Sequence, residues 1–210
     1  MKKTTIQPLN WELEKSYFDS GFSVICGTDE AGRGPLCGPV VAAACILPPF
    51  LEIPGLNDSK KLTEKKREEL FGIISEKALS YAVAEISNEE IDRLNILNAS
   101  QKAMRIAVSE LTIPPELVLV DGNIARDFPC KAVTVVKGDS KSPNIAAASI
   151  LAKVTRDRIC IRLNELYPQY GIAKHKGYPT KEHMDAVRKY GPSPVHRLSF
   201  LGFLNNEQKK

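Results

Sequence analysis

Four consecutive apolar residues near the middle of the chain, Leu117-Val118-Leu119-Val120, end at Asp121-Gly122. Neighbouring side chains of a strand point to opposite faces, so apolar residues at every position require a strand that is covered on both faces. Such strands lie in the centre of sheets that carry helices on both sides. The segment therefore predicts an α/β fold, and it places the carboxylate of Asp121 at the end of a central strand.

Strand and helix patterns alternate around this segment. The other predicted strands are at about 22–29, 40–47, 81–86 and 131–136, and the predicted helices run from Thr63 to about 79, from Ser87 towards Leu111 and from Ser142 to about Tyr167. Each of these helices begins at a Ser or Thr, residue types that cap helix N-termini. A further short helix is expected within the first twenty residues. The order predicts a mixed sheet with helices on its faces.

The overall composition narrows the class of protein. The chain has 29 Lys and Arg against 25 Asp and Glu, so a surface that binds a polyanion must be local. Its five cysteines are scattered without a C-x-x-C pair, which predicts neither a disulfide framework nor a zinc site and favours a reducing cytoplasm. No stretch approaches the roughly 20 apolar residues that a membrane span needs. We therefore expect a soluble cytoplasmic protein that makes no contact with a membrane.

Asp29 and Glu30 are adjacent at the end of the first predicted strand, just before Gly32-Arg33-Gly34-Pro35. Adjacent side chains of a regular strand face opposite ways, so the two carboxylates can share a cation only where the strand breaks, and this turn supplies the break. In most proteins, however, an Asp-Glu pair at a turn is solvated surface. Asp121 has a similar alternative, because aspartate often begins a turn such as Asp121-Gly122-Asn123.

Asp157 lies on the last predicted helix, where Ile150, Val154 and Ile161 have the spacing of the same face. This spacing predicts a carboxylate on a buried stripe, where an unneutralised charge is costly. One solution is a salt bridge within the helix, for which Lys153, Arg156 and Arg158 are available. The other solution is a cation that Asp157 shares with Asp29, Glu30 and Asp121.

Four clustered carboxylates would hold hard divalent cations, which prefer oxygen ligands. Two such ions about 4 Å apart would stabilise the attacking and leaving oxygens of a phosphodiester during hydrolysis. The chain also offers cations for phosphate contacts in or beside predicted loops, namely Lys60, Lys61, Lys65, Lys66, Arg67, Lys137, Lys141, Lys174 and Lys176. We assign Lys137-Gly138-Asp139-Ser140-Lys141 to a turn, and we interpret His175, His183 and His196 as surface or structural residues.

Several motifs of the chain, taken in order and spacing, resemble the bacterial type 2 ribonucleases H, the ribonuclease HII family. The matching segments are DEAGRGPLCGP at 29–39, LNDSKKL at 56–62, VDGN at 120–123, residues 144–157, HKGYPTKEH at 175–183 and YGPSPVHR at 190–197. The resemblance covers about residues 24–203. It implies a ribonuclease H-like five-stranded mixed sheet flanked by helices. We expect a single domain over residues 1–210, with a catalytic core over about 22–170 and a helical C-terminal extension over about 171–210.

The resemblance also implies roles for individual residues. Asp29, Glu30, Asp121 and Asp157 correspond to catalytic acids that bind Mn2+ or Mg2+. The loop Gly32-Arg33-Gly34 corresponds to the one that recognises a ribonucleotide 2′-OH, the group that distinguishes RNA from DNA. Glycines suit this task because the backbone must approach the sugar closely. Tyr178 corresponds to a tyrosine that packs on the adjoining deoxyribose, and Lys60 to a basic residue near the substrate phosphate.

These correspondences predict an endonuclease that hydrolyses the RNA strand of RNA/DNA hybrids and cuts on the 5′ side of single ribonucleotides in duplex DNA. Two-metal catalysis would leave 3′-OH and 5′-phosphate ends, and we expect the protein to act as a monomer. Two alternatives remain open. One is another metal-dependent nuclease on the same fold, because a fold does not fix a substrate. The other is a hybrid-binding protein without catalytic activity.

Overall fold

The computed structural model describes residues 9–204 and contains a five-stranded mixed sheet in the order β3-β2-β1-β4-β5. The strands are β1 (Ile25–Ala31), β2 (Val40–Ile46), β3 (Ser80–Ile86), β4 (Leu117–Asp121) and β5 (Lys131–Val135). The first three pair antiparallel, and β4 is parallel to both β1 and β5. The predicted α/β fold with a five-stranded mixed sheet is therefore confirmed.

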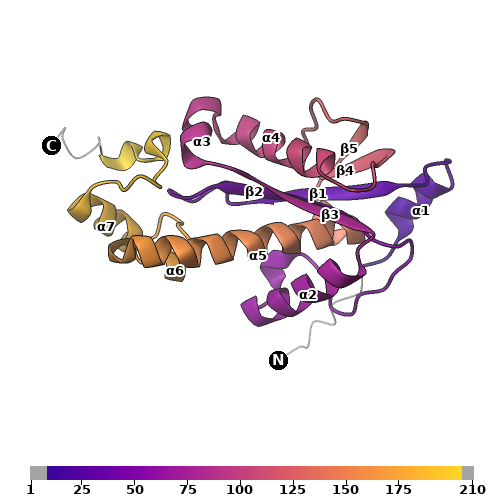
Figure 1. Cartoon of the computed structure of the whole chain (residues 1–210), viewed down its shortest axis with the longest axis horizontal. Helices are drawn as coiled ribbons and strands as arrows, with labels where there is room; N and C mark the ends of the chain where they lie inside the picture. Colours follow the sequence, from indigo (N-terminus) through magenta and orange to yellow (C-terminus); the bar gives the residue numbers. More distant parts are fainter. Residues whose placement is uncertain (1–8, 205–210) are drawn as a thin grey trace.

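Helices cover both faces of the sheet (Figure 1). On one face lie α3 (Asn88–Leu94) and α4 (Ile96–Ser109), and on the other lie α1 (Glu12–Phe18), α2 (Glu64–Lys77) and the long α5 (Pro143–Leu166). In β4, Val118 and Val120 pack in the α4-side cluster, whereas Leu117 and Leu119 pack with Ile145 of α5. This confirms that β4 is covered on both faces.

The first turn of α5 packs directly against β1. A Cβ atom added at Gly27 would lie 2.2 Å from the backbone nitrogen of Ile145, so only glycine permits this approach. The N-terminus of α5 is fixed by Ser142, whose Oγ accepts a hydrogen bond from the Ile145 amide and donates one to the buried carboxylate of Glu14. This close packing holds α5 beside the end of β1 that carries Asp29.

The region predicted as one helix between Ser87 and Leu111 is two helices. The chain breaks at Asn95, which has a φ of +67° and caps the N-terminus of α4 with its side chain. The caps expected at Thr63, Ser87 and Ser142 are all present. The Ser and Thr caps thus predicted where the helices start. The break at Asn95 was not predicted, because no Gly or Pro marks it.

Beyond α5, the chain forms α6 (Ile172–His175) and α7 (Lys181–Tyr190), which lie past one end of the sheet (Figure 1). Short 3-10 turns complete the fold at Ser59–Lys61, Gly138–Ser140, Pro168–Tyr170, Leu198–Phe200 and Gly202–Leu204. This C-terminal extension bonds back to the loop between β1 and β2, where the amides of Leu36 and Gly38 donate to the carbonyls of Gly177 and Val195, both at 2.8 Å. Among residues 9–204, no helix is long and apolar enough to cross a membrane.

Candidate active site

Three carboxylates meet beside the end of β4. The strand break expected at Asp29-Glu30 is not observed, because both residues lie within β1 and pair with Ala43 and Ala42 of β2. Strands β1 and β4 are parallel neighbours with Thr28 opposite Val120, so the next residues, Asp29 and Asp121, lie side by side. The Glu30 amide donates to Asp29 Oδ1 at 2.7 Å, and the Gly138 amide donates to Asp121 Oδ1 at 2.6 Å. Ligands of open α/β sheets bind at such carboxyl ends of strands. Asp29, Glu30 and Asp121 all line one cleft of about 360 Å³.

The cations beside these acids are largely exposed and only partly neutralise them: Arg33 Nη1 is 3.4 Å from Glu30 Oε1, and the charge of Lys60 also lowers the pKa of Glu30. Asp29 is only 4% exposed, and burial raises its pKa well above the usual value, with further increases from the charges of Glu30 and Asp121. Burial also raises the pKa of Glu30; Arg33 lowers it, and Asp121 raises it. Buried carboxylates that repel one another form a site that fits a hard divalent cation, because such a cation neutralises them and accepts oxygen ligands.

The residues predicted to contact substrate line the same cleft. Its walls carry Gly32, Arg33, Gly34, Lys60 and Tyr178. The ring of Tyr178 is 45% exposed and lies beside Gly34, where an added Cβ would be 3.4 Å from the ring. Lys60 is mainly exposed, and its ammonium is 3.7 Å from Asp139. The structure thus gathers all five predicted residues around the three acids.

Two buried arginines hold the loop of residues 32–39 in place, and the sequence reasoning missed both. The guanidinium of Arg197, from the C-terminal extension, donates to five carbonyls of this loop, those of Gly32, Arg33, Pro35, Gly38 and Pro39, at 2.8 to 3.2 Å. Arg156 of α5 donates to the carbonyls of Cys37, Pro39 and Lys176. No spacing rule predicts such contacts, because all of them except the one between Arg156 and Lys176 join residues more than 100 positions apart.

The backbone geometry at position 32 explains why this loop requires glycine there. Its φ is +101°, a conformation that residues with a side chain rarely adopt, and an added Cβ would lie 2.0 Å from Arg156 Nε. The loop backbone therefore passes directly over the Arg156 side chain. The position that the family resemblance assigns to 2′-OH recognition is thus a rigid backbone surface with cations beneath it.

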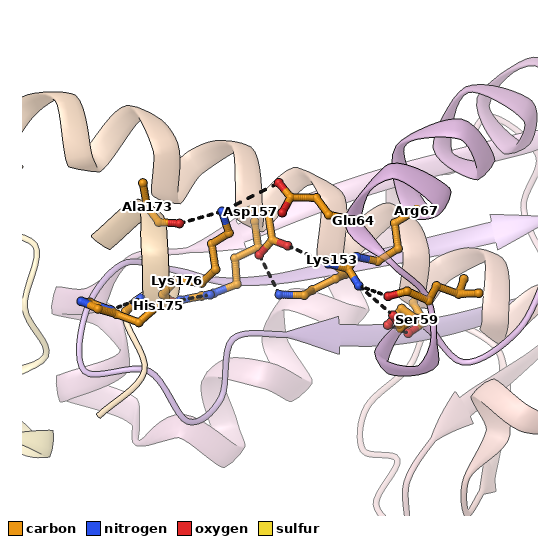
Figure 2. A network of polar contacts seen from close by, with 12 residues as sticks. Ser59, Glu64, Arg67, Lys153, Asp157, Ala173, His175 and Lys176 are labelled. Carbon is orange, nitrogen blue, oxygen red and sulfur yellow. Dashed lines mark hydrogen bonds and ion pairs between the residues drawn. The ribbon is translucent and has the colours of Figure 1, made fainter. Parts of the chain in front are cut away.

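Asp157 was expected to join the metal site, but the structure does not bring it to the other three acids. It is 4% exposed, and its Oδ1 is 2.7 Å from Lys153 Nζ while its Oδ2 is 3.6 Å from Arg67 Nη2 (Figure 2). The salt bridge considered as the alternative is the arrangement observed. The expected buried stripe is also shorter, since Ile161 is 42% exposed.

A further acid, Asp139, lies close to Asp121, and the sequence pattern indicated only a turn for it. It lies in the 3-10 turn Gly138–Ser140, directly after the amide that bonds Asp121, and it is 6% exposed. Burial raises its pKa, and the charges of Asp58 and Asp121 raise it further, although Lys60 lowers it. Neither Asp139 nor Asp157 lines the cleft itself. Asp139, however, is repelled by Asp121 and pairs with the exposed Lys60, whereas Asp157 is buried against two cations.

The histidines predicted to be surface or structural include a closed, buried pair. His183 Nε2 and His196 Nε2 are 3.1 Å apart, and Cys37 lies close to both. The Ser193 amide donates to His196 Nδ1, which leaves the proton of the neutral His196 ring on Nε2. His183 Nδ1 lies 3.0 and 3.1 Å from the carbonyls of Tyr178 and Gly177, to which it donates. Every ring nitrogen thus has a partner, which indicates a structural role.

Comparison with known proteins identifies close relatives of this arrangement. The family model described as Ribonuclease HII matches residues 26–202. A ribonuclease HII of Marinomonas sp. is 60% identical over 178 residues, which are 84% of this chain and 89% of the relative. One from Acetivibrio thermocellus is 52% identical over 187 residues, 89% of this chain and 73% of the relative. The crystal structure of ribonuclease H2 from Pyrococcus horikoshii superposes with a TM-score of 0.72 at 27% identity, covering 90% of this chain and all of that one.

Proposed function

This chain belongs to the ribonuclease HII family and is a ribonuclease H-type endonuclease, and we propose that it directs hydrolysis to ribonucleotides in two settings. It hydrolyses the RNA strand of RNA/DNA hybrids, and it cuts on the 5′ side of single ribonucleotides in duplex DNA. The products carry 3′-OH and 5′-phosphate ends. The observation that supports this most is one cleft that joins buried, mutually repelling carboxylates to the Gly32-Arg33-Gly34 loop.

We assign the metal site to Asp29, Glu30, Asp121 and Asp139. Asp139 replaces Asp157 in this set because the charge of Asp121 raises its pKa despite the nearby Lys60, whereas Asp157 is paired with Lys153 and Arg67. Divalent ions bound there, Mn2+ or Mg2+ and two in number, would supply an activated water and neutralise charge on the reacting phosphate. The β1 and β4 strands fix the directions of Asp29 and Asp121, so the protein contributes a rigid ligand geometry.

The walls of the cleft select and orient the duplex. The backbone of Gly32, Arg33 and Gly34 approaches the ribose closely enough to bond its 2′-OH, and the exposed ring of Tyr178 packs on the adjoining sugar. Lys60 contacts phosphate, which positions the strand without reading its sequence. We further propose that the protein acts in the cytoplasm as a monomer.

The test uses a DNA duplex that carries one internal ribonucleotide, with an all-DNA duplex of the same sequence as its control. The purified protein and an Asp121→Asn variant are incubated with each duplex in Mg2+, Mn2+ or EDTA, and the product ends are mapped. We expect metal-dependent cutting 5′ to the ribonucleotide by the wild-type protein alone. Equal cutting of the all-DNA duplex would indicate a different nuclease on this fold, and tight binding without cutting would indicate a binding protein.

A further inference from the structure

One buried carboxylate next to the cleft has no place in the proposed metal site. Asp157 of α5 is 6% exposed in its side chain and touches two cations, Lys153 one helical turn before it and Arg67 of α2 (Figure 2). Lys153 lines the cleft together with Asp29 and Glu30. A buried anion therefore lies directly behind a cation of the cleft wall.

The contact restricts a side chain that would otherwise be mobile. Ordering the long side chain of a lysine costs conformational entropy, so an unpartnered lysine does not hold one position. The distance of 2.7 Å between Lys153 Nζ and Asp157 Oδ1 is that of a charge-assisted hydrogen bond. Because Asp157 is buried and rigid, it fixes the ammonium at one place on the wall.

The second contact of Asp157 is weaker and reaches another part of the cleft. Arg67 Nη2 is 3.6 Å from Asp157, while Arg67 Nη1 donates to the carbonyls of Ser59 and Leu62, on either side of Lys60, at 3.1 and 2.6 Å. Those two bonds hold the turn without help from Asp157. The main effect of Asp157 is therefore on Lys153.

We propose that Asp157 is a positioning residue that fixes Lys153 so that its ammonium meets a backbone phosphate of the bound duplex, and that it does not hold metal. The inference rests on the proposed function, because the phosphate belongs to the substrate. A fixed ammonium on the wall of the cleft that Asp29, Glu30 and Asp121 also line suits a phosphodiester, because the negative charge of the phosphate is stabilised by both the ammonium and the metal ions.

A double-mutant cycle tests the proposal through the single-turnover rate of cutting at saturating duplex. We expect Asp157→Asn and Lys153→Met each to lower this rate about tenfold, and the double variant to be no more than about twofold slower than Lys153→Met. We also expect the Mn2+ affinity of Asp157→Asn to stay within about twofold of wild type. The matched control is Asp19→Asn, which breaks the Lys15–Asp19 pair of the same spacing on exposed α1 and should leave the rate unchanged.

Three results would overturn the proposal. A loss of Mn2+ affinity in Asp157→Asn as large as that in Asp121→Asn would make Asp157 a metal ligand. Fully additive losses would show that Asp157 does not act through Lys153. A Lys153→Met protein that cuts at the wild-type rate would leave Asp157 nothing to position, and this result does not depend on the folding of Asp157→Asn. A wild-type protein that cuts no duplex would instead overturn the proposed function, and this inference with it.

Discussion

At the scale of single residues, the site concentrates negative charge that Arg33 and Lys60 only partly neutralise. Asp121 raises the pKa of Asp29, of Glu30 and of Asp139, which means that its own charge destabilises all three ionised neighbours. Sites that are built for function commonly carry such a cost in stability. The same repulsion gives a bound cation a large advantage, so stability and metal binding are linked at this position.

Replacing Asp121 by Asn should therefore stabilise the metal-free protein. Asn can keep the hydrogen bond from the Gly138 amide while it removes one negative charge. We expect a gain of about 1 kcal/mol, or a few degrees in Tm. Thermal unfolding in EDTA measures it, and added Mn2+ should raise the Tm of wild type but not of the variant. A lower Tm for Asp121→Asn in EDTA would contradict this view of the site.

The buried guanidinium of Arg197 offers a second prediction at this scale. Burial, together with the nearby charge of Arg156, lowers its pKa to about 9, so the loop carbonyls must compensate a costly charge. Lysine cannot donate to five carbonyls at once. Arg197→Lys should lose roughly 2–4 kcal/mol in urea unfolding and weaken the preference for ribonucleotide-containing duplex over all-DNA duplex. An unchanged preference would show that Arg197 does not determine the shape of the Gly32-Arg33-Gly34 loop.

At the scale of elements, sequence patterns were informative wherever local chemistry decides the structure. The uniformly apolar β4 required helices on both faces, and three Ser or Thr caps located the helix starts. The choice between Asp139 and Asp157 depended instead on packing between distant segments. Helical periodicity correctly predicted that Asp157 is buried, but burial alone does not distinguish a metal ligand from one half of an ion pair. The turn Gly138–Ser140 carried no periodic signal at all.

The contact between α7 and the segment after it should make stability depend on pH. Burial and the neighbouring His183 lower the pKa of His196 to about 4. Above about pH 6.5 the ring is neutral in both the folded and unfolded states, but as the pH falls towards 4 the unfolded state binds its proton first, so stability decreases. Between pH 7 and pH 5 this contributes a loss of roughly 1–2 kcal/mol.

Urea unfolding of wild type and His196→Gln at these two pH values measures that contribution. The variant is needed as the reference because the acids with raised pKa, such as Asp29, change stability in the opposite direction as the pH falls. We expect the loss between pH 7 and pH 5 to be smaller in His196→Gln. An equal loss in both proteins would mean that the His183–His196 pair is not the source.

At the scale of the whole molecule, the C-terminal extension and the sheet share the loop that forms one wall of the cleft. Arg197, Val195 and Gly177 of the extension bond the loop between β1 and β2, and apolar residues of both parts pack in one cluster. The helical extension expected after α5 is present, but no sequence pattern indicated that it shapes the cleft. We infer that core and extension unfold as one unit.

This cooperativity is testable with the single tryptophan of the chain. Trp11 packs in the apolar cluster that joins β2 to helices α2 and α5, away from the extension. Trp11 fluorescence and far-UV circular dichroism should therefore give coincident urea transitions. A dichroism transition that begins before the fluorescence change would show that the extension unfolds separately.

In the proposed mechanism, Asp29, Glu30, Asp121 and Asp139 form one metal site that performs the cutting. Mn2+ binding and single-ribonucleotide cutting by Asp139→Asn test it most directly, because Asp139 enters the set through the structure rather than through the sequence motifs. We expect Mn2+ affinity to fall at least about tenfold and cutting at least about a hundredfold, in a protein that remains folded. An Asp139→Asn protein that binds Mn2+ and cuts like wild type would contradict this mechanism.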